Sequence, residues 1–377
     1  MTMTSSPQAT SQGVLEITNK GFGFLRSPAR HFEPKADDPY VPGPLIQKFK
    51  LAEGVLIAGS LEPARRGANG PRLARIDLIE GADPQLYHRR AWDELTPVDP
   101  TQWLRLETGP EPLTTRVMDL FTPIGKGQRG LIVAPPRTGK TVLLQHIANA
   151  VTKNHPDMHL MVLLVDERPE EVTDIRRNVQ GEVIASSSDR DTANHVRVAE
   201  LVMERAKRLT EQGRDVLVLL DSLTRLARAY NKHNNSGRTM SGGVDSRALE
   251  VPKRLFGQAR AFEEGGTLTI LGTALIETGS RMDEVIFQEF KGTGNMELVL
   301  DRQLAERRVY PAINLGASGT RKEERLLPPE MLEQITLLRR SMIQLRDPSA
   351  AMETLVKQLA KTDSNEEFLH TVAKFVK

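Results

Sequence analysis

The segment that most constrains this chain begins with the apolar run 131–133 and continues as Ala134-Pro135-Pro136-Arg137-Thr138-Gly139-Lys140-Thr141. It matches the phosphate-binding loop G-x-x-x-x-G-K-[ST], with Ala134 in place of the first glycine. In such a loop the backbone N–H groups and the N-terminus of the following helix point at phosphates. We therefore predict that Lys140 neutralises the β- and γ-phosphates of a nucleotide and that the Thr141 hydroxyl binds Mg²⁺. A chance Gly-Lys-Thr on a surface helix is the alternative, and the strand before the loop and the helix after it argue against it.

From about residue 113 onward, strand-length apolar runs alternate with helical patterns. The predicted strands are 129–134, 159–165, 182–187, 215–220, 267–274 and 296–301, and the predicted helices are 140–152, 170–178, 192–211, 223–231 and 249–262. Residues 329–376 also have a helical pattern. This alternation predicts a mostly parallel sheet with helices on both faces. Ligands of such sheets bind beyond the carboxyl ends of the strands.

Two acidic residues stand at or just after the ends of predicted strands. Asp221 closes the apolar run 216–220, as the acid on the Mg²⁺ side of a nucleotide site does. Glu167 follows the run 161–165, where it could orient or deprotonate the attacking water. Alternatively, Glu167 is an acid favoured by the dipole of the helix that Pro169 begins.

The N-terminal part has a different pattern. Short extended segments at 14–17, 21–25, 40–41, 54–61 and 72–79 are separated by turns rich in glycine, proline and asparagine. They predict a small β-barrel over residues 13–92. We expect residues 1–12 to be disordered and the proline-rich residues 93–112 to form a stiff linker to an α/β domain at 113–377.

Phe22 and Phe24 lie two residues apart, so on a strand they share a face. Aromatic side chains on a small barrel hold single-stranded nucleic acid by stacking against its bases. Two ordinary core phenylalanines are the alternative. Arg65, Arg66, Arg72 and Arg75 fall in a stretch without acids, which is either a basic contact surface or a solvated loop.

Composition narrows the classes of function that the chain can have. The 377 residues carry a net charge of +2, which argues against nucleic-acid binding by bulk charge. The absence of cysteine excludes disulfides and thiolate metal sites and fits a reducing cytoplasm. No apolar run approaches the ~20 residues of a membrane span, and no secretory signal is visible. We expect a cytoplasmic protein with no membrane partner.

The chain resembles the Rho family of bacterial transcription termination factors, which are hexameric RNA-dependent ATPases and 5′→3′ helicases. The resemblance runs from about Gly13 to about Leu359 and rests on motifs such as GFGFLRS, RGLIVAPPRTGKT, DERPEEV, LLDSLTRLARAYN, SGGVD, TALIETGSRMDEVIFQEFKGTGNMEL and SGTRKEE. It implies a RecA-type ATPase core preceded by an OB-type barrel. It also implies a homohexamer that acts on single-stranded nascent RNA and on the RNA polymerase elongation complex.

The resemblance assigns residues to the ATP site. ATP and Mg²⁺ would lie against Pro135, Pro136, Arg137, Thr138, Gly139, Lys140, Thr141, Arg168 and Asp221, with Thr141 and Asp221 at the metal. Glu167 would be the catalytic base. Arg308 and Arg321 match arginines that reach the γ-phosphate of a neighbouring subunit, and Arg225 matches one that couples the nucleotide to the interior of the ring.

The resemblance also assigns RNA contacts. In the barrel they are Phe22, Phe24, Arg26, Tyr40 and Arg72, the last standing where the family usually has a tyrosine. In two loops lining a central pore they are Arg238, Thr239, Ser241, Gly279, Ser280 and Arg281.

Three rival functions remain open. A rotary or export ATPase would share the core, but it lacks a GFGF barrel face and would not require RNA. A non-catalytic RNA-binding protein would not need intact Lys140, Glu167 and Asp221. A metal hydrolase could use His155 and His159, but Pro156 breaks the helix that would align them.

Overall fold

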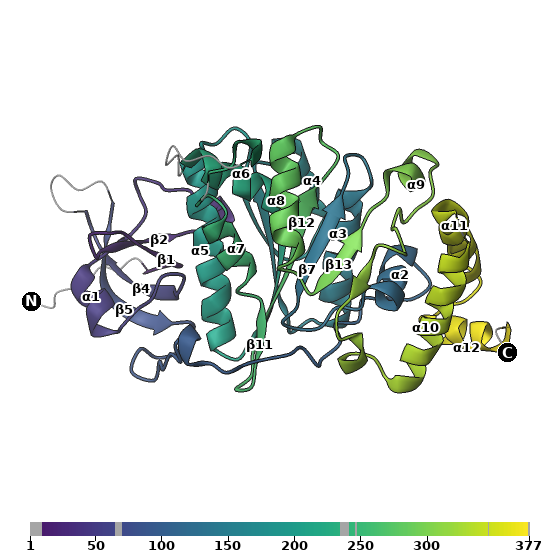
Figure 1. Cartoon of the computed structure of the whole chain (residues 1–377). Helices are drawn as coiled ribbons and strands as arrows, with labels where there is room; N and C mark the ends of the chain where they lie inside the picture. The colour runs from purple at the N-terminus through teal and green to yellow at the C-terminus, as the bar shows by residue number, and fades with distance from the viewer. Residues whose placement is uncertain (1–9, 65–69, 234–240, 246, 346, 376–377) are drawn as a thin grey trace, which may run out of the picture. The chain divides into compact units, whose positions relative to one another are not determined.

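The computed structural model describes residues 10–64, 70–233, 241–245, 247–345 and 347–375. The chain forms two compact units (Figure 1). The barrel unit contains Met1–Leu95 together with Arg197–Gln212, and the sheet unit contains Thr96–Val196 and Gly213–Lys377. The segment 197–212, which the sequence places in the α/β domain, therefore groups with the barrel.

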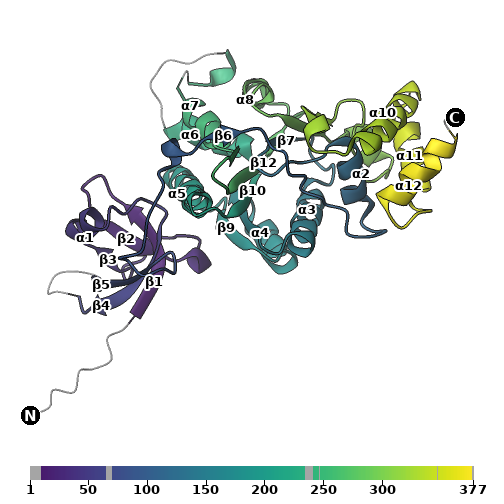
Figure 2. The same ribbon diagram turned by 90° about the horizontal axis from the view of Figure 1, so that it is seen from below.

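Five strands of the barrel unit close into a barrel in the order β1-β2-β3-β5-β4, as Figure 2 shows. They are β1 (Thr10–Ile17), β2 (Gly23–Arg26), β3 (Tyr40–Val41), β4 (Leu56–Glu62) and β5 (Arg72–Ile79), with helix α1 (Gly43–Lys48) after β3. Leu15, Leu25, Ile57 and Leu73 are among the buried residues that fill the interior. The predicted barrel is confirmed, and Phe22 and Phe24 do not belong to its buried core.

Two predicted boundaries are wrong. The expected N-terminal disorder does not include residues 10–12, because β1 begins at Thr10, which pairs with Ser60 of β4. Residues 93–112 are not merely a linker: β6 (Pro97–Val98) pairs with β11 (Arg260–Phe262), and Leu104 and Leu106 are fully buried in the core of the sheet unit. Proline spacing alone does not reveal such packing.

The sheet unit contains a mostly parallel sheet in the order β14-β13-β7-β12-β10-β8-β9. Its strands are β7 (Arg129–Ala134), β8 (His159–Val165), β9 (Glu182–Ser186), β10 (Asp215–Asp221), β12 (Thr267–Leu275), β13 (Met296–Val299) and β14 (Gly319–Thr320). Among the strands of the described residues, β14, which is antiparallel to β13, and the short pair β11–β6 depart from the parallel direction. The central strands are buried, as expected for a parallel sheet covered on both faces, and the predicted fold class is confirmed.

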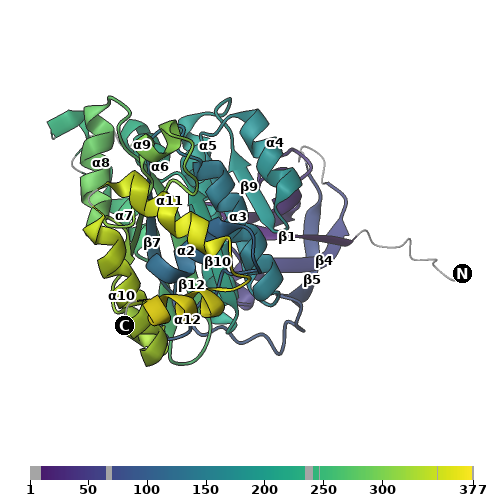
Figure 3. The ribbon, with the colours of Figure 1, turned by 90° about the vertical axis from the view of Figure 1, so that its right-hand side faces the viewer.

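Helices cover both faces of this sheet (Figures 2 and 3). One face carries α2 (Leu113–Phe121), α3 (Lys140–Asn154) and α4 (Pro169–Asn178), and the other carries α6 (Leu223–His233), α7 (Glu250–Phe256) and α8 (Arg281–Lys291). The long helix is α5 (Thr192–Glu211), and the C-terminal helices are α9 (Arg302–Glu306), α10 (Pro329–Gln344), α11 (Pro348–Leu359) and α12 (Asn365–Phe375). None of the helices in the described ranges combines the length and apolarity needed to cross a bilayer.

The predicted helix 249–262 ends earlier than expected, at Phe256. Gly257 caps it, and Arg260 and Ala261 then pair with β12 as strand β11. Hydrophobic periodicity could not distinguish the end of the helix from the start of the strand, because a short apolar segment suits either.

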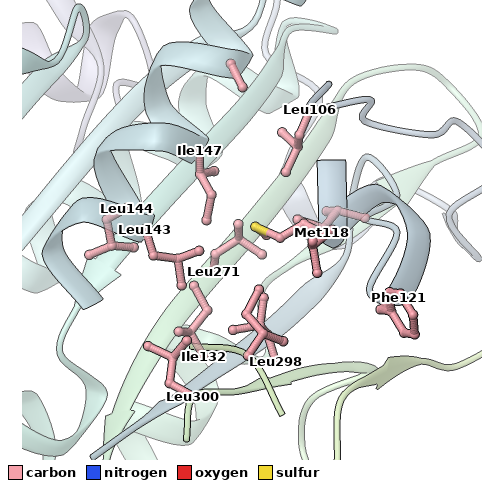
Figure 4. Close-up of a cluster of buried hydrophobic side chains, with 14 of the residues drawn as sticks. Leu106, Met118, Phe121, Ile132, Leu143, Leu144, Ile147, Leu271, Leu298 and Leu300 are labelled. Atoms are coloured by element: carbon pink, nitrogen blue, oxygen red, sulfur yellow. The ribbon is translucent and has the colours of Figure 1, made fainter. Parts of the chain in front are cut away.

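The core beneath α3 fixes that helix against the sheet. Figure 4 shows Ile132, Leu271 and Leu298 of three neighbouring strands facing Leu143 and Ile147 of α3. All of them are at most 3% exposed. Burying an apolar side chain of this size contributes ~1.5–3 kcal/mol, so the start of α3 is firmly held beside the carboxyl end of β7.

Candidate nucleotide site and RNA-binding face

The phosphate-binding loop joins β7 to α3. Gly139 is the N-cap of α3 and has φ 89°, a left-handed conformation that glycine adopts freely. The Thr138 side chain is buried and donates to the carbonyl of Pro135 at 2.7 Å, which closes the loop on itself. Ala134 is still part of β7 and has no positive φ, so this position does not need a glycine.

Lys140, Glu167 and Asp221 meet beyond the strand ends. The Lys140 Nζ atom is 2.6 and 2.7 Å from the two carboxylate oxygens of Asp221 and 3.1 Å from Glu167 Oε1. Thr273, on the neighbouring strand β12, donates to Asp221 Oδ1 at 2.6 Å. Both carboxylates are 1% exposed, and the structure brings together the three residues that the sequence singled out.

Glu167 has the electrostatics of a general base. Burial raises its pKa to about 7, while Lys140 acts to lower the pKa and Asp221 to raise it. Its Oε2 atom lies 3.2 Å from the guanidinium of Arg225, yet it accepts no hydrogen bond from any described residue. A buried acceptor without a donor suits an attacking water. The carboxylate faces Lys140 and Arg225, so helix capping does not account for its position.

The predicted arginines outside the phosphate loop occupy different places. Arg225 donates to the carbonyl of Asp166 beside Glu167, and its coupling role stays a prediction. Arg168 is the exposed N-cap of α4. Arg308 lines a pocket of about 570 Å³ together with Pro136 and Arg137 of its own phosphate loop.

Arg321 lies elsewhere. It lines two other cavities, one with Arg129 and Lys322 and one beside β13 and β14, and neither cavity includes a residue of the phosphate loop. Neither of these two cavities is shared with Pro136 and Arg137 or with Gly139 of the phosphate loop.

A second pocket beside the loop contains a residue that the sequence analysis missed. This cavity of about 320 Å³ has mostly apolar walls that include Gly139, Val142, Leu143 and Tyr310. Tyr310 is 45% exposed and borders both this pocket and the one at Arg137. An apolar slot with an exposed aromatic ring is suited to a nucleotide base. The sequence feature that could have drawn attention to Tyr310 is its position as an aromatic residue directly before Pro311.

The oxygen donors at the loop fit Mg²⁺. Thr141 lies in the first turn of α3, and the Asp221 carboxylate ends β10. No group of three or more His, Asp or Glu side chains within the described ranges could hold a metal without other ligands. Mg²⁺ is usually held by one or two protein oxygens together with phosphates and water, so this sparse donor set is the expected one.

Three aromatic rings form one face of the barrel. The centroids of Phe22 and Tyr40 are 5.3 Å apart, those of Phe22 and Phe24 5.8 Å, and those of Phe24 and Tyr40 6.0 Å. The three rings are half-buried and stand outside the core. Cross-strand pairing aligns Glu16, Phe24, Tyr40, Arg72 and Glu62 in one row over the five strands.

Arg26 supports this face instead of standing free on it. It is 8% exposed and its guanidinium is engaged by Glu16 and by Asp38. The same guanidinium lies 4.8 Å from the centroid of the Phe24 ring. Arg72, beside Tyr40, has a buried Nε atom that finds no hydrogen-bond partner among the described residues, and it remains a candidate RNA contact.

The two predicted pore loops meet in the sheet unit. Gly279 and Ser280 precede α8, whose first residue is the exposed Arg281. Ser241 begins the turn η3 (Ser241–Gly243), and a Cβ at Gly242 would lie 3.1 Å from the Arg281 carbonyl oxygen. Arg238 and Thr239 lie outside the described residues.

The histidines of the metal-hydrolase alternative face different partners. His155 Nε2 is 3.0 Å from the carbonyl of Arg105, and His159 Nε2 is 2.9 Å from Glu182 Oε2. The two imidazoles are thus engaged separately, and this alternative gains no support.

The elevated pKa of Glu167 predicts a pH dependence. The base must be deprotonated, so kcat/KM for ATP should fall about tenfold per pH unit as the pH drops below about 7. Glu167→Gln should lower kcat ~10²–10⁴-fold, and its residual rate should lack this dependence. If the variant shows the same fall with pH, Glu167 is not the titrating base.

The aromatic face predicts a separation of binding from stability. Phe22→Ala with Phe24→Ala should weaken single-stranded RNA binding by ~1–3 kcal/mol per lost stack while the melting temperature stays nearly unchanged. Phe32→Ala is the matched control, because Phe32 is fully buried and its truncation should cost ~3–5 kcal/mol of stability. A collapse of stability in the double variant would make the two rings core residues.

Comparison with known proteins supports both halves of this description. The model of the ATP synthase alpha/beta family nucleotide-binding domain matches residues 114–320. The model of the Rho termination factor RNA-binding domain matches residues 11–85.

Solved structures show the same fold at low identity. An ATPase from the type III secretion system of pathogenic bacteria aligns with a TM-score of 0.63 at 22% identity, over 82% of this chain and 95% of its own. An ATP synthase subunit from Nanoarcheaum equitans aligns with a TM-score of 0.64 at 16% identity, over 74% of this chain and 78% of its own.

Curated relatives are much more similar in sequence. The transcription termination factor Rho of Pseudomonas aeruginosa is 50% identical over 375 residues, which cover 98% of this chain and 89% of the relative. That of Bacillus subtilis is 51% identical over 360 residues, covering 95% of this chain and 83% of the relative. Because identity at this level extends over both the barrel and the nucleotide site, the chain belongs to the family of the transcription termination factor Rho.

Proposed function

We propose that this protein terminates transcription as an RNA-dependent ATPase that binds nascent RNA and moves along it in the 5′→3′ direction. The observation that carries the proposal is the contact of Lys140 with Glu167 and Asp221 in a chain that also has the aromatic face of Phe22, Phe24 and Tyr40. The first arrangement suits phosphoryl transfer and the second suits single-stranded bases.

At the nucleotide site, the arriving phosphates compete with the two carboxylates for Lys140. The ammonium then neutralises the β- and γ-phosphates, and this frees Glu167 to accept a proton from the attacking water. Thr141 and Asp221 would hold Mg²⁺, which would supply charge neutralisation of the phosphate oxygens. Tyr310 stacks against the base in the apolar pocket beside Gly139.

RNA is held at two places. Bases stack on Phe22, Phe24 and Tyr40 of the barrel, and the loops that contain Ser241 and Arg281 make a second contact. Because Arg26 is held by buried carboxylates, its contribution passes through the Phe24 ring. Transcription in bacteria takes place in the cytoplasm, so the proposed function implies a cytoplasmic protein. Its partner there would be the RNA polymerase elongation complex.

The active form is a ring of identical subunits, a homohexamer by the family pattern. Arg321 lies away from its own phosphate loop, which supports its action on the γ-phosphate of a neighbouring subunit. Arg308 lines a pocket with its own Arg137, so its geometry also allows action within one chain. An arginine supplied by a neighbour makes hydrolysis depend on assembly.

Strand displacement tests the function directly. An RNA–DNA hybrid with a single-stranded 5′ RNA extension should be separated when ATP is present, and Lys140→Ala should reduce this at least about 10²-fold. A hybrid with the extension on the 3′ side should stay intact. Equal displacement of the two hybrids, or none by the wild type, would contradict the proposal and favour an ATPase with another task.

Mixing two inactive variants tests the role of Arg321. Arg321→Ala and Lys140→Ala should each hydrolyse little ATP alone, but an equimolar mixture should regain activity. About a quarter of the interfaces in randomly mixed rings then combine an intact Lys140 with a neighbour's intact Arg321.

The matched control mixes Glu167→Gln with Lys140→Ala. Glu167 and Lys140 touch within one chain, so no interface in this mixture contains a complete site and activity should not return. If the Arg321→Ala mixture also stays inactive, Arg321 acts within its own chain.

A further inference from the structure

Ionic contacts connect the aromatic face to helix α5 within the barrel unit. Glu16 is the cross-strand partner of Phe24, and its carboxylate accepts hydrogen bonds from Arg26 and, at 3.1 Å, from Arg197 Nη1. Arg197 also donates to the carbonyl of Phe32 at 3.0 Å. The Glu16 side chain is only 12% exposed, so Arg26 and Arg197 share one nearly buried carboxylate.

Two residues earlier on the same helix, His195 is part of the sheet unit. It is 6% exposed, and its Nδ1 atom is 2.7 Å from the hydroxyl of Ser186, which also accepts from Asn194 at 2.7 Å. Its Nε2 atom lies 3.9 Å from the carboxylate of Asp166. The imidazole thus contacts the Ser186 hydroxyl through one nitrogen and faces the Asp166 carboxylate with the other.

Asp166 directly precedes Glu167 and helps to decide where the catalytic carboxylate points. It has φ 56°, a left-handed backbone that a non-glycine residue adopts only at a cost. Its N–H donates to the carbonyl of Ser186 at 2.8 Å, and its own carbonyl accepts from Arg225. His195 faces the side chain of the same residue. The costly backbone conformation at Asp166 is thus maintained by β9, the start of α5 and α6.

We propose that the start of α5 transmits the presence of RNA on the aromatic face to the catalytic base, with Arg197 responding to Glu16 and His195 positioning Asp166 and Glu167. The link rests on the proposed function, since it needs RNA at the barrel and ATP at Lys140. Arg197 and His195 lie two residues apart on a single helix, less than one turn, so a shift of one moves the other.

The charges give a reason why RNA changes this link. RNA bases that stack on Phe24 shift the ring against which the Arg26 guanidinium lies, which weakens the hold of Arg26 on Glu16. Glu16 is then drawn more strongly to Arg197. A ligand shifts an equilibrium only through such differential interactions, and couplings between sites are typically about 5–150-fold in affinity.

The decisive quantity is the ratio of ATP hydrolysis at saturating single-stranded pyrimidine RNA to hydrolysis without RNA. Arg197→Gln should lower this ratio at least about fivefold and leave RNA-free hydrolysis unchanged. Arg197→Lys retains the charge and should recover part of the ratio. Lys207→Gln is the matched control, because Lys207 lies on the same helix and pairs with Glu204, away from Glu16.

His195→Gln supplies the second arm. It should lower kcat without raising KM for ATP, because Lys140 and the base pocket remain intact. If both residues act along one path, the double variant should lose no more stimulation than the more affected single variant. If the losses of RNA stimulation in the two single variants multiply in the double variant, Arg197 and His195 act independently, and the proposed link is overturned.

The outcomes separate this link from the proposed function. A wild type that RNA does not stimulate would overturn both, because no signal would exist to transmit. A stimulated wild type with an equally stimulated Arg197→Gln variant would overturn the link alone.

Discussion

The contact of Lys140 with two buried carboxylates is the interaction on which the rest of the nucleotide site depends. A buried carboxylate without a partner is very costly, and here two of them, each 1% exposed, share one ammonium. Phosphates that take over Lys140 leave Glu167 and Asp221 to new partners, which are the water and the metal in the proposed reaction. In the proposed reaction, binding of the nucleotide phosphates to Lys140 and release of Glu167 from Lys140 are therefore one electrostatic event.

Much of this site could be predicted because its residues follow local rules. Gly139 and Lys140 stand between a strand and a helix, while Glu167 and Asp221 mark strand ends, and parallel strands bring those ends to one edge. The barrel was predictable in the same way from alternation and turn residues. In both cases a local pattern specified a position in the fold.

What could not be predicted depends on contacts between distant residues. Tyr310 borders the apolar pocket beside Gly139 only because the segment after α9 returns to the phosphate loop. Arg26 looks like an RNA contact in sequence, but Asp38 and Glu16 hold it beneath the aromatic rings. Leu104 and Leu106 lie in a proline-rich stretch and yet complete the core. The spacing of residues along the sequence does not reveal these contacts.

The central claim is that RNA drives ATP hydrolysis by this chain. The most direct measurement is the steady-state rate of ATP hydrolysis by the full-length protein with and without saturating single-stranded RNA. We expect RNA to increase the rate of the wild type markedly. The variant that lacks both Phe22 and Phe24 should lose this increase at subsaturating RNA and regain it when the RNA concentration is raised. Equal rates with and without RNA would contradict the account.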